Sequence, residues 1–101
     1  MTIQNQRTSL FLMANLGAEV SRLLSFKEKG DYIRTKETLD RANHILAEVR
    51  KLPDMKKRLE EIDLLSAVIA DILKTEPIFH VSSRHIQSYF SPFALRLLAK
   101  K

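Results

Sequence analysis

The feature that most constrains the fold is a glycine–aspartate pair, Gly30-Asp31, that separates two long stretches of helical apolar periodicity. Before this pair, apolar residues recur every three or four positions, as they do on one face of an α-helix: Met13, Leu16, Val20 and Leu23. Glycine readily adopts the left-handed conformation that ends a helix, and aspartate is a favourable N-cap for the next one. The pattern therefore predicts a helix over about residues 9–29 that folds back as a hairpin onto a second over about 31–52.

A proline marks the next boundary. Pro53 cannot continue the second helix, because it lacks a backbone N–H, but it suits the first position of a new one. The second helix presents an apolar face made of Tyr32, Leu39, Ala42, Leu46 and Val49. The third, predicted over about 54–74, presents Met55, Leu59, Ile62, Leu65, Ile69 and Leu73.

The chain after Glu76-Pro77 predicts a linker over about 75–83 and a shorter helix over about 84–100. Pro92 either divides this segment into two short helices or kinks a single one. An apolar face continues through the proline: Ile86, Phe90, Phe93 and Leu97. We expect one all-α domain over 1–101, an antiparallel bundle of three long helices and a Pro-interrupted fourth, with residues 1–8 frayed and Gly17 a tolerated weak position in the first helix.

Residue types limit the chemistry available to the chain. There is no cysteine, and two glycines are too few to build a P-loop or a dinucleotide-binding fingerprint. The three histidines, His44, His80 and His85, lack the i, i+4 spacing of a helical metal motif. His80 and His85 could converge on a metal with a carboxylate, but surface or packed histidines are the favoured interpretation. We predict no enzymatic activity, no cofactor and no metal.

The hydropathy of the chain bears on its location. The longest nearly uncharged apolar stretch, residues 9–18, is about half of the roughly 20 residues that a membrane-spanning helix needs. Read as a secretory signal, this stretch would follow an n-region with a single basic residue, Arg7. We therefore expect no membrane span and a cytoplasmic protein, a location that the lack of cysteine also fits.

The hairpin is similar to one tetratricopeptide unit over about residues 19–47. The matching positions are Phe26, Gly30-Asp31-Tyr32, Leu39 and Ala42, whereas Arg22, Leu23 and Thr35 depart from the motif. A tetratricopeptide solenoid needs at least three stacked repeats, and no internal repeat occurs here, so the resemblance implies no more than a helical hairpin.

The last quarter of the chain combines positive charge with aromatic residues. Residues 77–101 contain Arg84, Arg96, Lys100 and Lys101 and no acidic residue, so they supply +4 of the formal charge of +5. They also hold four of the seven aromatic residues, namely Phe79, Tyr89, Phe90 and Phe93. Such a segment can bind nucleic acid through phosphate contacts and stacking, or it can pack as the fourth helix of a bundle, which its helical spacing favours.

Two hypotheses about function follow from these patterns. The first is a non-enzymatic helical protein-interaction or adaptor module that self-associates, as a dimer for example, through its apolar faces and a candidate interface of Tyr89, Phe90, Phe93 and Leu97. The second is a nucleic-acid-binding accessory protein. Its candidate phosphate contacts are Lys56, Lys57, Arg58, Arg84, Arg96, Lys100 and Lys101, although a salt-bridged solvated surface is the favoured interpretation of Lys56-Lys57-Arg58.

Overall fold

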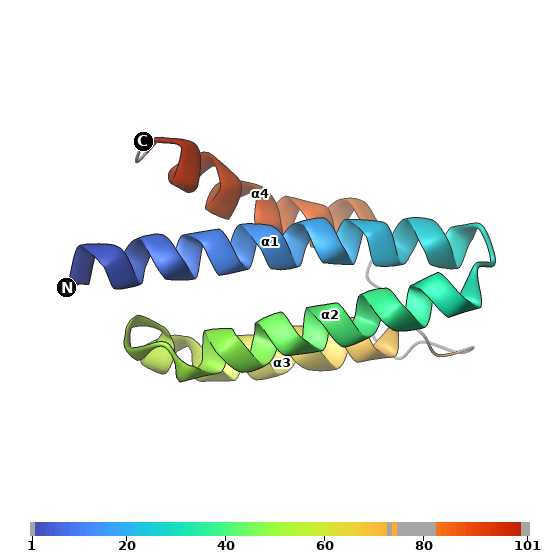
Figure 1. Ribbon diagram of the computed structural model, residues 1–101, viewed down its shortest axis with the longest axis horizontal. Helices are drawn as coiled ribbons and strands as arrows, with labels where there is room; N and C mark the ends of the chain where they lie inside the picture. The colour runs from blue at the N-terminus through green and yellow to red at the C-terminus, as the bar shows by residue number, and fades with distance from the viewer. Residues whose placement is uncertain (1, 73, 75–82, 100–101) are drawn as a thin grey trace.

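The computed structural model describes residues 2–72, 74 and 83–99, and every regular element in these ranges is a helix (Figure 1). In chain order the elements are α1 (Thr2–Glu28), α2 (Tyr32–Lys51), the 3-10 helix η1 (Pro53–Arg58), α3 (Leu59–Asp71) and α4 (Ser83–Ala99). The predicted all-α bundle is confirmed.

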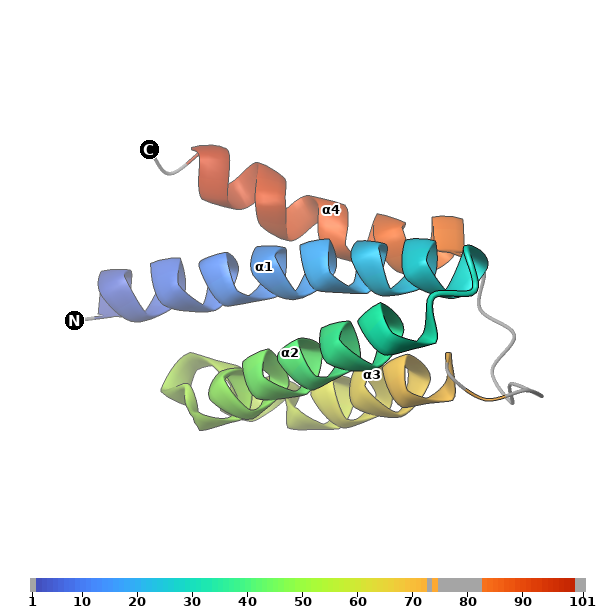
Figure 2. The same cartoon turned by 45° about the vertical axis from the view of Figure 1, so that its right-hand side comes forward.

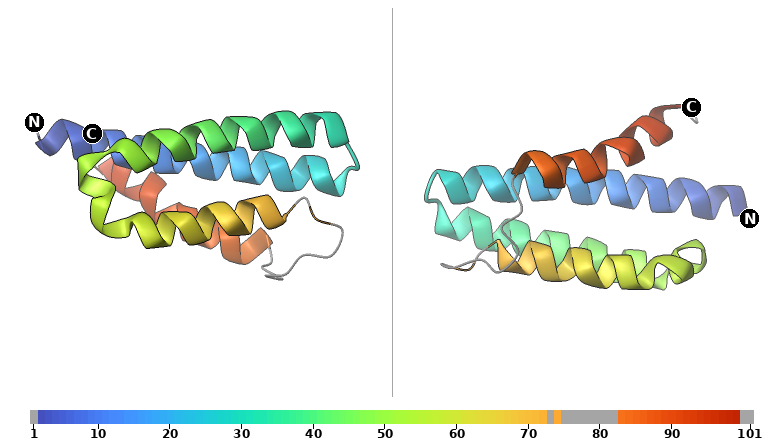
Figure 3. Two further views of the ribbon diagram at one scale, coloured as in Figure 1. Left: turned by 90° about the horizontal axis from the view of Figure 1, so that it is seen from below. Right: turned by 180° about the vertical axis from the view of Figure 1, so that it is seen from behind.

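The longest helix, α1, organises the bundle. It makes its most extensive contacts with α2 and with α4, while α3 packs against α2 (Figure 2). The view from behind shows α1 and α4 on one side of the bundle and α2 and α3 on the other (Figure 3, right). The start of α1, the 3-10 helix and the end of α4 lie at the same end of the molecule (Figure 1).

Most of the apolar positions that the helical periodicity predicts form the core, whereas Leu39 and Leu59 are half-buried and Leu73 lies outside the described residues. All five elements contribute, and Met13, Leu16, Val20 and Leu23 of α1 are completely buried. The other buried members are Ala42, Leu46, Val49, Met55, Ile62, Leu65, Ile69, Ile86, Phe90 and Phe93. Burial of these side chains supplies the main driving force for folding.

The turn between α1 and α2 has the predicted capping chemistry. Gly30 adopts a positive φ of 74°, and the amide of Asp31 donates to the carbonyl of Phe26 at 2.9 Å. The Asp31 carboxylate accepts a hydrogen bond from the amide of Arg34 at 3.1 Å, which makes it the N-cap of α2. The hairpin is therefore specified locally, by one residue that ends a helix and one that starts the next.

Two helix starts differ from prediction. Helix α1 begins at Thr2 rather than near residue 9, so residues 2–8 continue the helix instead of fraying. No glycine or proline occurs between Thr2 and Leu16, and a helix that is already nucleated extends at little cost through such residues. At the start of α2, Tyr32 was predicted to face inward but is 79% exposed. Thr35 and Thr38 occupy the inward positions, and their hydroxyls donate to the carbonyls of Asp31 and Arg34.

The predicted third helix is two elements. Its first turn is the 3-10 helix η1, and α3 ends at Asp71 rather than near residue 74. The tighter turn places Met55 in the core and sets Asp54 against α1, where the Ser9 hydroxyl donates to its carboxylate at 2.6 Å. Beyond the end of α3, the Lys27 ammonium donates to the carbonyl of Ile72.

Helix α4 is continuous from Ser83 to Ala99 with Pro92 inside it, so the alternative of a single helix is the correct one. Figure 1 shows that its first half runs beside α1 and that its second half turns away. Proline cannot donate a helical hydrogen bond, and the preceding Ser91 hydroxyl donates to the carbonyl of Gln87 at 3.2 Å. Of the linker predicted over 75–83, residues 75–82 lie outside the described residues.

Candidate functional site

The aromatic residues of α4 pack inside the monomer. Phe90 and Phe93 are each only 5% exposed, and Tyr89 is half-buried, with its ring edge-on to Phe90 at 5.1 Å between centroids. Phe90 and Phe93 are therefore not open to a partner, because the bundle uses them as core. Among the described side chains of the candidate interface, Tyr89 alone keeps substantial exposed surface. The side chain of Leu97 lies outside what the structure describes.

A polar cluster joins α4 to the η1–α3 segment. Arg58 donates two hydrogen bonds to Glu61, from Nε at 3.2 Å and from Nη2 at 2.5 Å, and the Tyr89 hydroxyl donates to the same carboxylate. The Arg58 guanidinium also lies 5.2 Å from the ring centroid of Phe93. This cluster attaches the C-terminal helix to α3 through charge-assisted hydrogen bonds.

The titration of this cluster follows from its contacts. The hydrogen bond with Glu61 raises the pKa of Arg58, and the hydrogen bond from Arg58 is the main cause that lowers the pKa of Glu61. Burial, followed by the hydrogen bond to Glu61, raises the pKa of Tyr89 above 10. These shifts favour a charged Arg58, an ionised Glu61 and a neutral Tyr89 at neutral pH, which are the states that form these hydrogen bonds.

The candidate phosphate contacts separate into distinct groups. Lys56, Lys57 and Arg84 are exposed, whereas Arg58 is committed to Glu61 and Phe93 inside the monomer. For the rest, the structure gives no side-chain position: Arg96 is described only as part of the α4 backbone, and Lys100 and Lys101 lie outside the described residues.

An apolar groove of about 190 Å³ lies between α3 and α4. Leu65 and Ile86 are buried at its base, Val68 and Tyr89 are half-buried, and Leu64 is 58% exposed at its margin. Glu61 and His85 complete the lining. The exposed lining of this groove is chiefly hydrocarbon.

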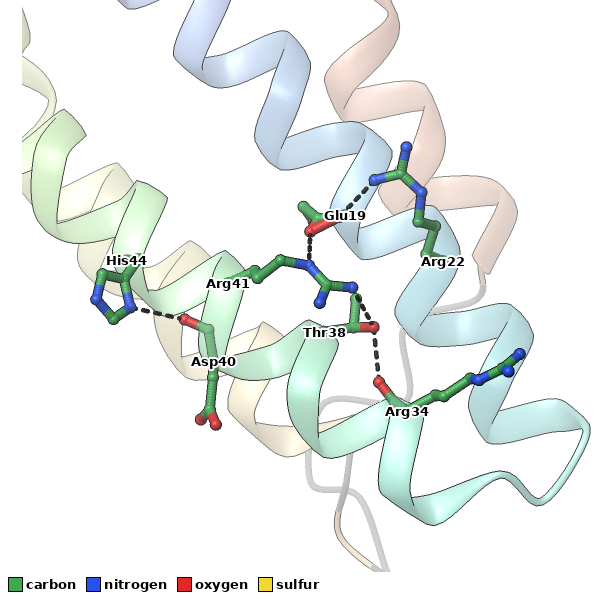
Figure 4. Close-up of polar contacts among 7 residues, drawn as sticks. All are labelled: Glu19, Arg22, Arg34, Thr38, Asp40, Arg41 and His44. Carbon is green, nitrogen blue, oxygen red and sulfur yellow. Dashed lines mark hydrogen bonds and ion pairs between the residues drawn. The ribbon is translucent and has the colours of Figure 1, made fainter.

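A second groove, called the polar groove because most of the residues that line it are polar or charged, lies between α1 and α2, and no motif in the sequence predicted it. Figure 4 shows the polar contacts among its residues. Its centre is Glu19, a carboxylate whose side chain is only 5% exposed. One oxygen accepts from Arg41 Nε at 2.7 Å, and the other is paired with Arg22 one turn along α1. Arg41 Nη2 also donates to the completely buried Thr38 hydroxyl at 3.1 Å. The groove is lined by Asn15, Glu19, Arg22, Asp40, Arg41, His44 and Ile45.

The charge state of Glu19 is set by this environment. Burial acts to raise the pKa of Glu19, but the hydrogen bonds and positive charges of Arg41 and Arg22 outweigh it, so the pKa lies below its ordinary value. One signal in the sequence could have found the site: Glu19 falls between Leu16 and Leu23, three and four residues away, on the apolar face of α1. A charged residue in such a stripe needs a buried partner.

The histidines and acidic residues of the described ranges form no cluster that could hold a metal ion. His44 lies in the polar groove and His85 lines the apolar one, while His80 is outside the described residues. Over the same part of the chain, no helix has both the length and the hydropathy to cross a membrane.

Comparison with known proteins adds no family to this description. The chain matches no protein-family model, and no significant match to it was found among curated proteins or among solved structures.

Proposed function

We propose that this protein is a non-enzymatic helical interaction module that associates with a second copy of itself. The supporting observation is the apolar groove between α3 and α4, in which Leu64 stays exposed beside the half-buried Val68 and Tyr89. Leu64 is not part of the buried core, so its side chain is available for contact with a partner.

A second copy is the partner that this groove fits best. A two-fold symmetric contact uses the same patch on both subunits, so the patch must carry both a protruding group and a hollow. Among the apolar residues that line the groove, Leu64 is exposed whereas Leu65, Val68 and Ile86 are buried or half-buried, so Leu64 can supply the protruding group and the other three the hollow. In a two-fold contact, each Leu64 would enter the hollow of the other subunit.

The groove is small, which sets the expected strength. Stable interfaces bury more than about 1,000 Å² in total, and weaker, transient contacts fall below the standard size. Leu95, in the second half of α4 and 66% exposed, can enlarge the contact beyond the groove. We expect a reversible dimer with a dissociation constant of roughly micromolar to millimolar.

Sedimentation over a wide concentration range tests this proposal. The wild-type chain should shift from monomer to dimer, and Leu64→Glu should abolish the shift because it places a charge in the hydrophobic contact. Ile33→Glu is the matched control, since Ile33 is an equally large aliphatic residue, 75% exposed, on α2 and outside the groove. A wild-type chain that stays monomeric at millimolar concentration, or a Leu64→Glu variant that dimerises as the wild type does, contradicts the proposal.

Nucleic-acid binding is the second candidate function, and one spatial observation favours it. The exposed Lys56 and Lys57 of η1 lie at the same end of the molecule as the last turns of α4, which carry Arg96 (Figure 2). Phe90 and Phe93 are buried and cannot serve as a stacking platform, so the binding proposed here rests on phosphate contacts.

A salt series tests this candidate. Binding to duplex DNA should weaken linearly on a log–log plot as salt rises, and the slope should shrink by about 1 to 2 in the Lys56→Gln/Lys57→Gln variant. Lys36→Gln, at an exposed position on α2, is the control. Absence of binding at low salt removes this candidate.

A further inference from the structure

Two arginines in the groove between α1 and α2, Arg22 and Arg41, are held in place by contacts with buried groups. Arg41 is fixed at two points, by the buried carboxylate of Glu19 and by the buried hydroxyl of Thr38 (Figure 4). Thr38 is itself held, because its hydroxyl donates to the carbonyl of Arg34 at 2.7 Å. Arg22 reaches the same carboxylate from α1. Two guanidinium groups from different helices thus converge on one buried acid.

The groove has an excess of hydrogen-bond donors. Its lining carries two arginines and two carboxylates, Glu19 and Asp40, so the formal charges balance, but Figure 4 shows the Asp40 carboxylate directed away from both guanidinium groups. A guanidinium has five N–H donors. Arg41 uses two of them, and Arg22 uses one, in the bonds to Glu19 and Thr38. Their remaining donors make no further hydrogen bond within the described part of the chain, and the two side chains are 53% and 56% exposed.

His44 adds a third polar group on the same rim. Its Nδ1 lies 3.2 Å from the carbonyl oxygen of Asp40, and because a carbonyl only accepts, Nδ1 carries the hydrogen. This leaves Nε2 as the second polar atom of the ring. Beside it, the half-buried Ile45 provides apolar surface in a groove of about 610 Å³.

From this arrangement we propose that the groove binds a phosphate group through Arg22 and Arg41. The planar fork of arginine matches phosphate oxygens, and guanidinium groups that are already oriented lose less conformational entropy on binding. The groove is larger than one phosphate, so it also has room for an organic group esterified to it, resting on Ile45. This site is separate from the α3–α4 groove and stands or falls independently of self-association.

The test is a titration of the full-length protein followed by two-dimensional ¹H–¹⁵N NMR at constant ionic strength. Phenyl phosphate and inorganic phosphate are the two probes. Saturable shifts should appear at the amides of Asn15 and His44 and at the Nε signals of Arg22 and Arg41. Tighter binding of phenyl phosphate assigns the site to a phosphate ester, and equal binding assigns it to free phosphate.

Variants locate the binding. Arg22→Gln should weaken it about ten-fold or more, and it leaves the Arg41–Glu19 pair in place, so it remains informative if Arg41→Gln unfolds the hairpin. Arg34→Gln is the matched control, because Arg34 pairs with Asp31 at 3.6 Å and does not line the groove. The proposal is overturned if the shifts do not saturate, if Arg22→Gln binds as tightly as the wild type, or if Arg34→Gln weakens binding equally.

Discussion

Gly17 offers the sharpest test of the packing between α1 and α4. A Cβ added there would lie 2.6 Å from the Cβ and 2.8 Å from the Cγ of Phe90. The Phe90 Cβ is bonded directly to the backbone, so the overlap cannot be relieved by a rotamer change and α4 has to shift. Overpacking of this kind costs about 1–3 kcal/mol, whereas replacing glycine by alanine inside a helix gains about 1 kcal/mol. We expect Gly17→Ala to destabilise the protein by about 1 kcal/mol net, and by as much as about 2.

Urea unfolding followed by circular dichroism measures this difference. The control is Ala18→Gly at the next position, which is exposed and reports the helix propensity alone, with an expected loss of about 1 kcal/mol. In thermal unfolding, 1 kcal/mol corresponds to a shift of roughly 4–8 °C for a domain of about this size. If Gly17→Ala is instead more stable than the wild type by as much as Ala18→Gly is less stable, the close approach of α1 and α4 is refuted.

Three further predictions concern the turn, the α3–α4 cluster and the polar groove. Gly30→Ala should lower the free energy of unfolding, measured in urea, by about 1–2 kcal/mol, because the positive φ of 74° is strained for a residue with a Cβ. No atom lies within 4 Å of the added Cβ, so this strain is the whole effect. An unchanged urea midpoint would contradict this. In a Tyr32→Phe variant, Tyr89 is the only tyrosine that remains, and its absorbance should titrate above pH 10. Because the pKa of Tyr89 is raised in the folded state, its contribution to stability is complete below pH 10 and is lost as the pH rises above 10. A titration at the ordinary pKa of tyrosine would refute the buried hydrogen bond. The pKa of Glu19 is lowered in the folded state, so the stability that its carboxylate contributes is present above pH 4.5 and is lost as the pH falls below 4.5. In Glu19→Gln, the free energy of unfolding should therefore depend less on pH in this acidic range. An unchanged pH dependence would contradict the pairing with Arg41.

The helical elements and the core were predictable because they depend on local chemistry. Spacings of three and four along the chain correctly placed Met13, Leu16, Val20 and Leu23 on the buried face of α1. The capping residues Gly30 and Asp31 fixed the hairpin, since the conformations that end and begin a helix involve only neighbouring residues. The errors at the helix ends, such as the late start predicted for α1, reflect how little the sequence marks a boundary when neither glycine nor proline is present.

The candidate sites were less predictable, because the sequence leaves open which faces meet. Periodicity put Phe90 and Phe93 on one face but could not say whether that face packs within the monomer or lies open to a partner. Arg58 was a candidate phosphate contact, but the favoured interpretation of its segment was a salt-bridged surface, and Arg58 does pair with Glu61 three residues on. Only the tertiary structure places its guanidinium over the ring of Phe93.

The amino-acid sequence by itself determined the helices, the hairpin turn and most of the core, because hydrogen bonding and side-chain periodicity within a helix are properties of adjacent residues. Only the tertiary structure decided that Gly17 is a point of close approach to Phe90 rather than a weak position, and that the buried Glu19 is matched by Arg41, 22 residues away. These features arise where helices distant in the sequence come together, and the geometry of that packing is set by all the side chains at the interface at once.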